Sequence, residues 1–252
     1  MNQHQNQNHA IAVISDIHSN VFALEAVLQD IGARGIQTIV NLGDALFGPI
    51  APVQTAELLM RRTDVVHIMG NCDRYLLEEE LDSPTFQHVK PLLRQDVLDW
   101  LRTFRKQWVY EDLLFCHGTP FADDEYLMER VAPYGTDEKS VTELMIELAN
   151  VPQNVIFCGH THVHRSVWLP DGKWIVNPGS VGLPAYFEEK PHPHFMESLT
   201  PHAKYATATR QGDSWKVEHI LLPYDYEKAA KLAEEAGRMD YAHAIRTGRA
   251  RL

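Results

Sequence analysis

Five short apolar segments of this chain each end at residues that can bind a metal ion. The segments cover residues 10–15, 38–42, 65–69, 113–116 and 155–158, and the side chains that follow are Asp16 and His18, Asp44, Asn71 and Asp73, His117, and His160 and His162. Because the ends of parallel strands gather at one edge of a sheet, these scattered positions can form a single site. Carboxylate oxygens and imidazoles at such an edge can hold divalent cations, which favours a hydrolytic enzyme.

No single motif in this series is strong evidence for a metal. An Asp-x-His pair occurs by chance in many proteins, and Gly-Asp after a strand is more often a turn than a ligand. His160 and His162 are stronger evidence, because side chains two residues apart on an extended segment lie on the same side. Five segment ends that each supply Asp, Asn or His are hard to explain as turns, so the joint pattern indicates a metal site.

The elements that must position these residues are buried strands alternating with helices. The five segments are rich in Val and Ile and lack strict alternation, as expected for strands buried on both faces. Ser19 or Asn20 can cap a helix that Gly32 can end, and a second helix is expected to begin at Pro52. The order strand, helix, strand, helix, strand predicts a layered α/β fold.

The rest of the sequence predicts further elements and three insertions. The predicted elements are helices over 74–105 with breaks at Pro84 and Pro91, a helix from Asp137 to Ala149, hairpins over 166–176 and 205–221, and a helical tail over 225–246. Residues 184–202 contain four prolines and three histidines and are expected to be a loop. We expect a disordered tail over 1–9 and one domain over 10–252, with insertions at about 74–105, 119–150 and 184–202 near the site.

Composition and charge limit the classes of partner. A length of 252 residues with 44% hydrophobic and 23% charged residues is typical of a globular protein with a large core. The formal charge of −11 disfavours a large nucleic-acid partner, which needs a basic surface. A small phosphate ester remains compatible with this charge, because a bound metal can reverse the local field.

Cysteine usage and hydropathy indicate the compartment. Cys72, Cys116 and Cys158 do not form the pattern of a disulfide framework. No apolar segment approaches the roughly 20 residues that span a bilayer, and the first nine residues do not resemble a secretory signal. We therefore expect a cytoplasmic protein without a membrane partner; the sequence leaves the oligomeric state open.

The ordered series of candidate ligands resembles the calcineurin-like metallophosphoesterase superfamily. The segment Gly70-Asn71-Cys72-Asp73 most resembles the small bacterial phosphodiesterase branch, and the resemblance covers about residues 10–182. It implies a four-layer αββα sandwich with two mixed β-sheets, to which we add a small helical or loop cap formed by the insertions.

The resemblance also implies two divalent metal ions and their ligands. Asp16, His18 and His162 would hold one ion, Asn71, His117 and His160 would hold the other, and Asp44 would bridge the two. Manganese is the expected metal, with Fe, Zn, Ni or Co as alternatives, since imidazole and carboxylate ligands suit all of them. Two ions roughly 3.5–4 Å apart can clamp phosphoryl oxygens and hold a bridging hydroxide as the nucleophile. Asp44, Asn71 and His160 would thus act in catalysis through the metals.

Cys72 departs from the superfamily pattern. Many members have a His at this position that, with the following acid, protonates the leaving group, and Cys72 cannot do so. Cys72 is a candidate substrate-side residue, either a reactive thiol or, as we favour, a small filler. Asp73 and His164 are candidate proton donors, although an exposed loop histidine is the simpler interpretation of His164. Without a general acid, the enzyme should prefer leaving groups that depart easily.

Other candidates have weaker support in the sequence. Tyr126, Arg130 and Tyr134 of the 119–150 insertion are guesses for the substrate pocket, and His67 is interpreted as a core histidine. The histidines of the proline-rich loop, His192, His194 and His202, are expected to be solvated.

The leading hypothesis is a dinuclear-metal phosphoesterase that hydrolyses small phosphodiesters or phosphoanhydrides, with a small phosphate ester or nucleotide as its ligand. A dinucleoside polyphosphate hydrolase and a serine/threonine protein phosphatase are alternatives with the same chemistry. A non-catalytic protein-binding scaffold is the alternative from another class, but such a scaffold would be expected to lose metal ligands.

Overall fold

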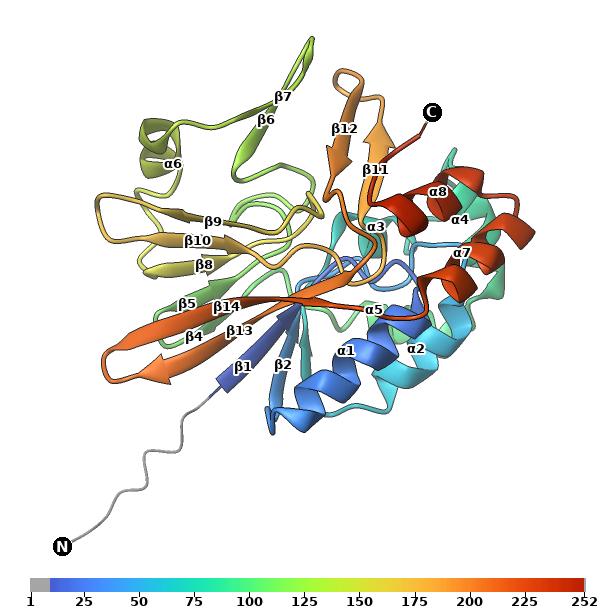
Figure 1. The fold of residues 1–252 in the computed structure, drawn as a ribbon, viewed down its shortest axis with the longest axis horizontal. Helices are drawn as coiled ribbons and strands as arrows, with labels where there is room; N and C mark the ends of the chain where they lie inside the picture. Colours follow the sequence, from blue (N-terminus) through green and yellow to red (C-terminus); the bar gives the residue numbers. More distant parts are fainter. Residues whose placement is uncertain (1–9, 252) are drawn as a thin grey trace, which may run out of the picture.

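Two mixed five-stranded β-sheets stacked face to face form the centre of the molecule (Figure 1). The computed structural model describes residues 10–251. Helices cover the outer face of each sheet, which gives the four layers of an αββα sandwich. The predicted fold class is therefore confirmed. Within residues 10–251, no helix is long and apolar enough to cross a membrane.

The first sheet carries the N-terminal candidate ligands. Its strands, in spatial order, are β14 (Ser214–Leu222), β13 (Ala203–Gln211), β1 (Ala10–Ile14), β2 (Thr38–Asn41) and β3 (Val65–His67). Strands β1, β2 and β3 are parallel, with Val13 paired to Val40, and β13 joins β1 in antiparallel orientation. The parallel strands therefore end at the same edge of the sheet.

The second sheet carries the remaining candidate ligands. Its order is β4 (Trp108–Tyr110), β5 (Leu113–Phe115), β8 (Val155–Phe157), β10 (Trp174–Asn177) and β9 (Arg165–Trp168). Strands β5, β8 and β10 are parallel, and the two outer strands are antiparallel. Strand β4 was not predicted from the sequence.

Burial of both faces of β1 explains why its sequence does not alternate in polarity. Ile11 and Val13 belong to the core between the two sheets, where the rings of Phe115 and Phe157 stack with centroids 5.2 Å apart. Ile14, on the other face, belongs to the core beneath the helices. Both faces thus exclude water and favour β-branched side chains.

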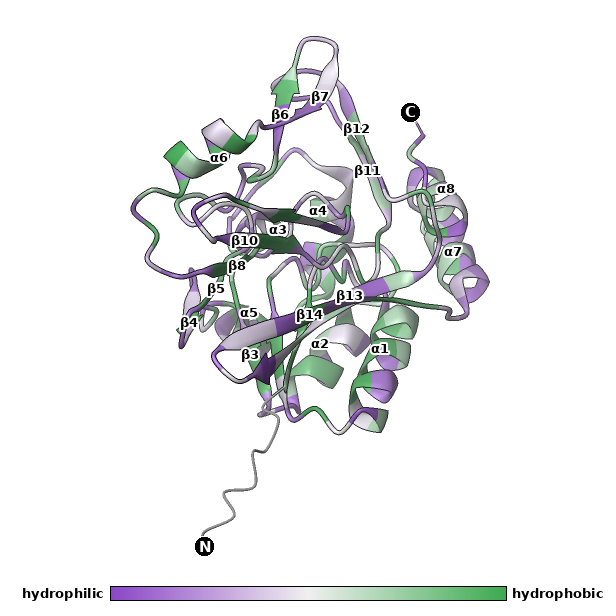
Figure 2. Cartoon of the chain, turned by 60° about the vertical axis from the view of Figure 1, so that its left-hand side comes forward, coloured by the Kyte–Doolittle hydropathy of each residue, from purple (hydrophilic) through white to green (hydrophobic). Residues whose placement is uncertain are grey.

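The helices that cover the first sheet begin where the sequence predicts. In α1 (Val21–Ala33) the Asn20 side chain accepts a hydrogen bond from the Ala23 backbone N–H, and α2 (Pro52–Met60) has Pro52 in its first turn. Figure 2 shows hydrophobic and hydrophilic residues in stripes along α1, as expected for a helix with one packed face. Helix α1 continues through Gly32, and the left-handed residue that follows it is Gly35 (φ +71°).

Helices near the remaining surfaces are shorter than predicted. The 74–105 region contains the end of α3 (Asn71–Tyr75), then α4 (Pro84–Val89), the 3₁₀ helix η1 (Lys90–Leu92) and α5 (Gln95–Leu101). Helix α6 (Val141–Glu147) covers the second sheet. The predicted single tail helix is two helices, α7 (Tyr226–Glu235) and α8 (Met239–Thr247), because Gly237 takes a left-handed conformation (φ +74°) between them.

Two β-hairpins project above the edge where the parallel strands end (Figure 1). One is β6 (Glu129–Ala132) with β7 (Gly135–Glu138), and the other is β11 (Ala185–Glu188) with β12 (His194–Glu197). The prediction of a loop over 184–202 was therefore wrong, since main-chain hydrogen bonding orders both halves of this segment. The first hairpin lies in a region expected to be mainly loop.

Candidate metal centre

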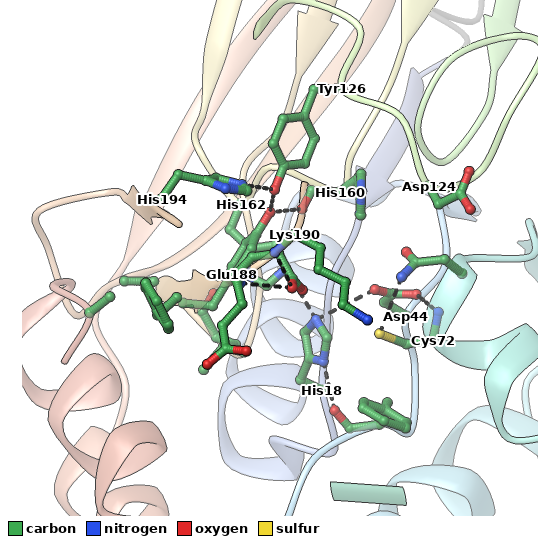
Figure 3. Close-up of a pocket in the computed structure, with 18 of the residues that line it drawn as sticks. His18, Asp44, Cys72, Asp124, Tyr126, His160, His162, Glu188, Lys190 and His194 are labelled. Atoms are coloured by element: carbon green, nitrogen blue, oxygen red, sulfur yellow. Dashed lines mark hydrogen bonds and ion pairs between the residues drawn. The ribbon is translucent and has the colours of Figure 1, made fainter. Parts of the chain in front are cut away.

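The seven predicted metal ligands come together at the ends of the parallel strands. Figure 3 shows four of them, His18, Asp44, His160 and His162, around the shared cavity. Two of them follow β1, one follows β2, one begins α3 after β3, one follows β5, and two follow β8: Asp16 and His18, Asp44, Asn71, His117, and His160 and His162. Six of the seven are buried, and His160 is partly exposed. The topology thus gathers residues that are up to 146 positions apart in the sequence.

Asp16, His18 and His162 form the first group of candidate ligands. Their ligand atoms lie within 4.8 Å of one another, and His162 Nε2 is 3.4 Å from Asp16 Oδ1. The Nε2 atoms of His18 and His162 are 3.1 Å apart. Asp16 Oδ1 is buried and has no hydrogen-bond partner.

Backbone carbonyls fix the orientation of these imidazole rings. The carbonyl of Phe47 is 2.7 Å from His18 Nδ1, and that of Leu183 is 2.5 Å from His162 Nδ1. A carbonyl can only accept, so each Nδ1 carries the proton and each Nε2 of a neutral ring presents a lone pair. Two lone pairs 3.1 Å apart repel each other unless a cation lies between them. This geometry and the unpartnered Asp16 oxygen fit a bound metal ion.

Asp44, His117, His160 and Asn71 form the second group. Asp44 Oδ2 is 3.5 Å from His117 Nε2 and 3.7 Å from His18 Nε2, so this carboxylate faces both groups. Asn71 Oδ1 is 3.0 Å from His117 Nε2, whose ring is held by the Leu42 carbonyl at Nδ1. A carboxylate between two ligand groups is what a bridging ligand requires.

The backbone at the site is held in an uncommon conformation. Asp16, His18, Asp44, His160 and His162 all have φ between 46° and 68°. Non-glycine residues rarely adopt left-handed φ values, and such strain concentrates at functional sites when surrounding contacts hold it. Main-chain bonds supply those contacts, since the Asp16 and His18 N–H groups donate to the carbonyls of Gly43 and Asp44.

The charges of the buried groups favour a cation at the site. Burial, reinforced by His117, lowers the pKa of His160 to about 3, so this ring is neutral and keeps a free lone pair. Burial alone would also lower the pKa of His117, but the Asp44 carboxylate outweighs it and raises the pKa to about 10. Burial alone would raise the pKa of Asp44, but the neighbouring imidazoles, His117 first, hold it well below its ordinary value, so Asp44 stays ionised and favours positive charge beside it.

The family model of the calcineurin-like phosphoesterase superfamily domain matches residues 10–197. The chain belongs to this superfamily. It is therefore a metal-dependent phosphoesterase, with divalent ions as the implied cofactors. An uncharacterized protein of Methanocaldococcus jannaschii is 28% identical over 250 residues, which cover 87% of this chain and 89% of that protein. The crystal structure of a metallophosphoesterase from Sphaerobacter thermophilus is similar in fold, with a TM-score of 0.72, 23% identity, and coverage of 94% of this chain and 100% of that one.

The Asp73 carboxylate is turned toward the backbone and is not part of either group of candidate metal ligands. It is fully buried, and its carboxylate accepts hydrogen bonds from the backbone N–H groups of Asp44 (2.7 Å), Ala45 (2.9 Å) and Gly70 (3.1 Å). These donors occupy the oxygens that a proton donor would need. The geometry favours a positioning role for Asp73 over the predicted proton donation.

Cys72 lines the cavity beside Asp44. Its backbone N–H donates to Asp44 Oδ1 at 2.9 Å, and its sulfur is 3.7 Å from the Asn71 amide nitrogen. Burial, and then the negative charge of Asp44, hold the pKa of the Cys72 thiol well above its ordinary value. A neutral thiol is a poor nucleophile, so the filler interpretation is favoured.

His164 lies outside the cavity that the ligands share. Its ring faces His219, with centroids 5.8 Å apart, and its Nδ1 is buried without a hydrogen-bond partner among residues 10–251. The structure therefore does not bring this candidate proton donor to the metal groups. The partly buried His67 packs against Trp100 and Phe104, and among residues 10–251 only its Nδ1 has a hydrogen-bond partner, the Asn41 amide.

A cavity of about 1510 Å³ lies above the metal groups. Residues from all three insertions line it, among them Thr85, Tyr126, Arg130, Lys190 and His194. Two of the predicted pocket residues are thus present, whereas the side chain of Tyr134 is 78% exposed and does not line the cavity.

Three residues connect the insertions to the metal ligands. Tyr186 packs its ring 4.6 Å from that of His162 and donates its hydroxyl hydrogen bond to the His160 carbonyl at 3.1 Å. The Tyr126 hydroxyl lies 2.7 Å from the Tyr186 hydroxyl and 2.9 Å from His194 Nε2. His194, expected to be solvated, is 2% exposed, so that expectation was wrong. No pattern in the sequences of β11 and β12 indicated this network, because contacts with residues of other elements bury Tyr186 and His194.

Proposed function

We propose that the chain is a dinuclear-metal phosphoesterase of the small bacterial phosphodiesterase type, acting on small phosphodiesters or phosphoanhydrides. The observation that carries the proposal is the position of the Asp44 carboxylate, which lies between two groups of histidine side chains. When bound, two divalent cations, with manganese expected, supply Lewis acidity and lower the pKa of water from 15.7 to about 7. No protein nucleophile is then required.

The residues of this chain prepare the site for that chemistry. Asp16, His18 and His162 would hold one ion, and Asn71, His117 and His160 the other. Backbone carbonyls hold the rings of His18, His117 and His162 at Nδ1, which leaves each Nε2 directed inward. Such preorganisation removes most of the reorganisation that ligand binding would otherwise cost.

The cavity supports a small substrate over a folded phosphoprotein. Hairpins β6–β7 and β11–β12 both contribute to its lining, so the metal groups lie in a walled cavity and not on a flat surface. A volume of about 1510 Å³ exceeds the roughly 300–1,000 Å³ of typical ligand pockets and leaves room for a nucleotide-sized ester. All seven ligand positions are filled, which disfavours the non-catalytic scaffold.

Metal analysis joined to a substrate panel tests the proposal. We expect two transition-metal ions per chain after reconstitution, and hydrolysis of bis(p-nitrophenyl) phosphate or of a dinucleoside polyphosphate. The Asp44→Asn variant should lose turnover and at least one ion, whereas Asp99→Asn, an exposed α5 residue paired with Arg102, should retain both. One ion or none in the wild type, with no hydrolysis of either substrate, would exclude the proposal.

A further inference from the structure

Five lysine and arginine side chains line the cavity above the metal centre, and three of them form ion pairs with carboxylates. Three form ion pairs: Arg130 with Glu143, Lys139 with Glu147, and Arg238 with Asp240. The other two, Lys190 and Arg251, have no ion pair within the described part of the chain. An uncompensated ammonium or guanidinium in a cavity is available to bind an anionic ligand.

The tip of the β11–β12 hairpin directs Lys190 toward the metal centre. Glu188 Oε1 accepts hydrogen bonds from the backbone N–H groups of Glu189 (2.9 Å) and Lys190 (3.1 Å). Glu188 is thereby turned to the main chain, and neither Glu188 nor the adjacent Glu189 forms an ion pair with the Lys190 ammonium among residues 10–251. Figure 3 shows this side chain extending from the hairpin toward the side of the cavity that His18, Asp44 and Cys72 line.

The hairpin that carries Lys190 is attached to the metal ligands themselves. Immediately before β11, the Leu183 carbonyl accepts the His162 Nδ1 proton, and within β11 Tyr186 contacts both His160 and His162. From β12, His194 closes the network through Tyr126. Lys190 is therefore held on a base fixed relative to the metal centre, as a binding residue requires.

We propose that Lys190 binds a second phosphoryl group, adjacent to the one held at the metal centre, so that the substrate class is a phosphoanhydride. This inference rests on the proposed function. A simple phosphodiester carries one negative charge, which the metals engage, whereas an anhydride presents further phosphate oxygens beside the scissile bond. A lysine ammonium acts as a point charge that suits such oxygens.

The same assignment accounts for a site without an imidazole at Cys72. In anhydride hydrolysis, the oxygen of water forms a bond to phosphorus and the bond from phosphorus to the bridging oxygen breaks. The electron pair stays on that oxygen, the leaving phosphate departs as an anion, and the proton of water is released to solvent. Lys190 stabilises the developing charge without giving up its proton, so no general acid is needed.

Binding measurements separate this role from a general effect of charge. The probes are methylenediphosphonate, which has two phosphoryl groups and no hydrolysable bridge, and inorganic phosphate, titrated calorimetrically into the metal-reconstituted protein. We expect Lys190→Met to weaken methylenediphosphonate binding by about 10–100-fold, and phosphate binding by less than about threefold. Lys190→Arg should restore part of the affinity. Arg251→Met removes an equal charge from the same cavity and should change neither.

Kinetics with wild type and Lys190→Met complete the test. The KM for ADP or a dinucleoside polyphosphate should rise about 10–100-fold, and that for bis(p-nitrophenyl) phosphate should stay constant. Equal weakening of both probes, no change in either, or the same effect in Arg251→Met would overturn the assignment. If the wild type hydrolyses esters but binds methylenediphosphonate no more tightly than inorganic phosphate, only the Lys190 assignment is wrong. If the wild type binds methylenediphosphonate more tightly than inorganic phosphate but hydrolyses no substrate, the proposed function is wrong and the Lys190 binding site is retained.

Discussion

Replacing Asp73 by Asn tests whether this carboxylate positions the loop that carries Asp44. The Asp73 oxygens accept three backbone N–H groups, two at Oδ2 and one at Oδ1, in a fully buried setting. An amide has only one oxygen. If that oxygen takes the place of Oδ2, the amide N–H₂ faces the Ala45 N–H, and the opposite orientation leaves both Asp44 and Gly70 unpaired.

The magnitude follows from the bonds that must be lost. One hydrogen bond to a charged acceptor contributes about 1.5–3 kcal/mol, and the remaining two lose their charge assistance. An opposing effect is that burial, and then the repulsion from Asp44, raise the pKa of Asp73 to about 7, so the ionised carboxylate carries a cost that Asn would remove. Because three donors converge on the carboxylate, we expect the bond loss to prevail, with a decrease of about 2–4 kcal/mol in the free energy of unfolding. This corresponds to a fall in Tm of about 4–16 °C for a chain of this size.

Urea unfolding at pH 8 and calorimetric Mn²⁺ titration measure the two consequences. Loosening the Asp44 loop should weaken metal affinity about 10–100-fold, as for other groups that orient metal ligands. The control Asp99→Asn replaces an exposed carboxylate of the same charge and should stay within about 0.5 kcal/mol. Unchanged or increased stability with unchanged metal affinity, and a lower kcat for poor leaving groups, would refute the positioning role and restore Asp73 as a proton donor.

Two further predictions concern the core. Burial lowers the pKa of His67 to about 4, so its contribution to stability is complete above the unfolded-state value of about 6.5 and is lost as the pH falls through 4. Between pH 7 and pH 4 the wild type should therefore lose on the order of 3 kcal/mol more unfolding free energy than His67→Phe, as measured by urea unfolding. The same decrease with pH in both proteins would contradict this. Phe115→Ala deletes a fully buried ring stacked on Phe157 and should cost about 3–5 kcal/mol, read from the urea midpoint; a cost below about 1 kcal/mol would show that the sheets repack.

The convergence of the candidate ligands at one edge of the sheets could be inferred from the sequence because two simple signals coincide there. The segments are mainly apolar, since every strand among them except the edge strand β3 is buried on both faces, and the polar residues that follow mark the edge of the sheet. Parallel pairing of β1, β2 and β3, and of β5 and β8, then brings those edges together. The order in which the candidate ligands occur along the sequence, from Asp16 to His162, supplied the remaining information. The helix and strand propensities of single residues contributed little to the prediction.

The hairpins above the site could not be inferred in the same way. In β11, Tyr186 packs against a histidine that is remote in the sequence, and in β12 His194 is buried by Tyr126, so tertiary contacts decide their environment. Prolines between the two strands resemble a loop signal. In the first hairpin, Gly135 with φ +129° marks the turn, but the flanking residues are mostly polar and partly exposed. Short strands of this kind lack the apolar pattern that identifies core strands.

Contacts join the β11–β12 hairpin to the candidate metal ligands, so we expect metal binding and substrate selection to depend on each other. The strands fix the ligands, while the insertions supply the cavity lining, and these two parts meet at Leu183 and Tyr186. A change that shifts the β11–β12 hairpin would move Lys190 and, through the same segment, disturb the carbonyl that fixes the His162 ring. Variants selected for a different substrate at this hairpin should therefore also change metal affinity, unless Leu183 and Tyr186 keep their contacts. We therefore expect the hairpin to act as a support of the proposed metal centre and not as an independent cover.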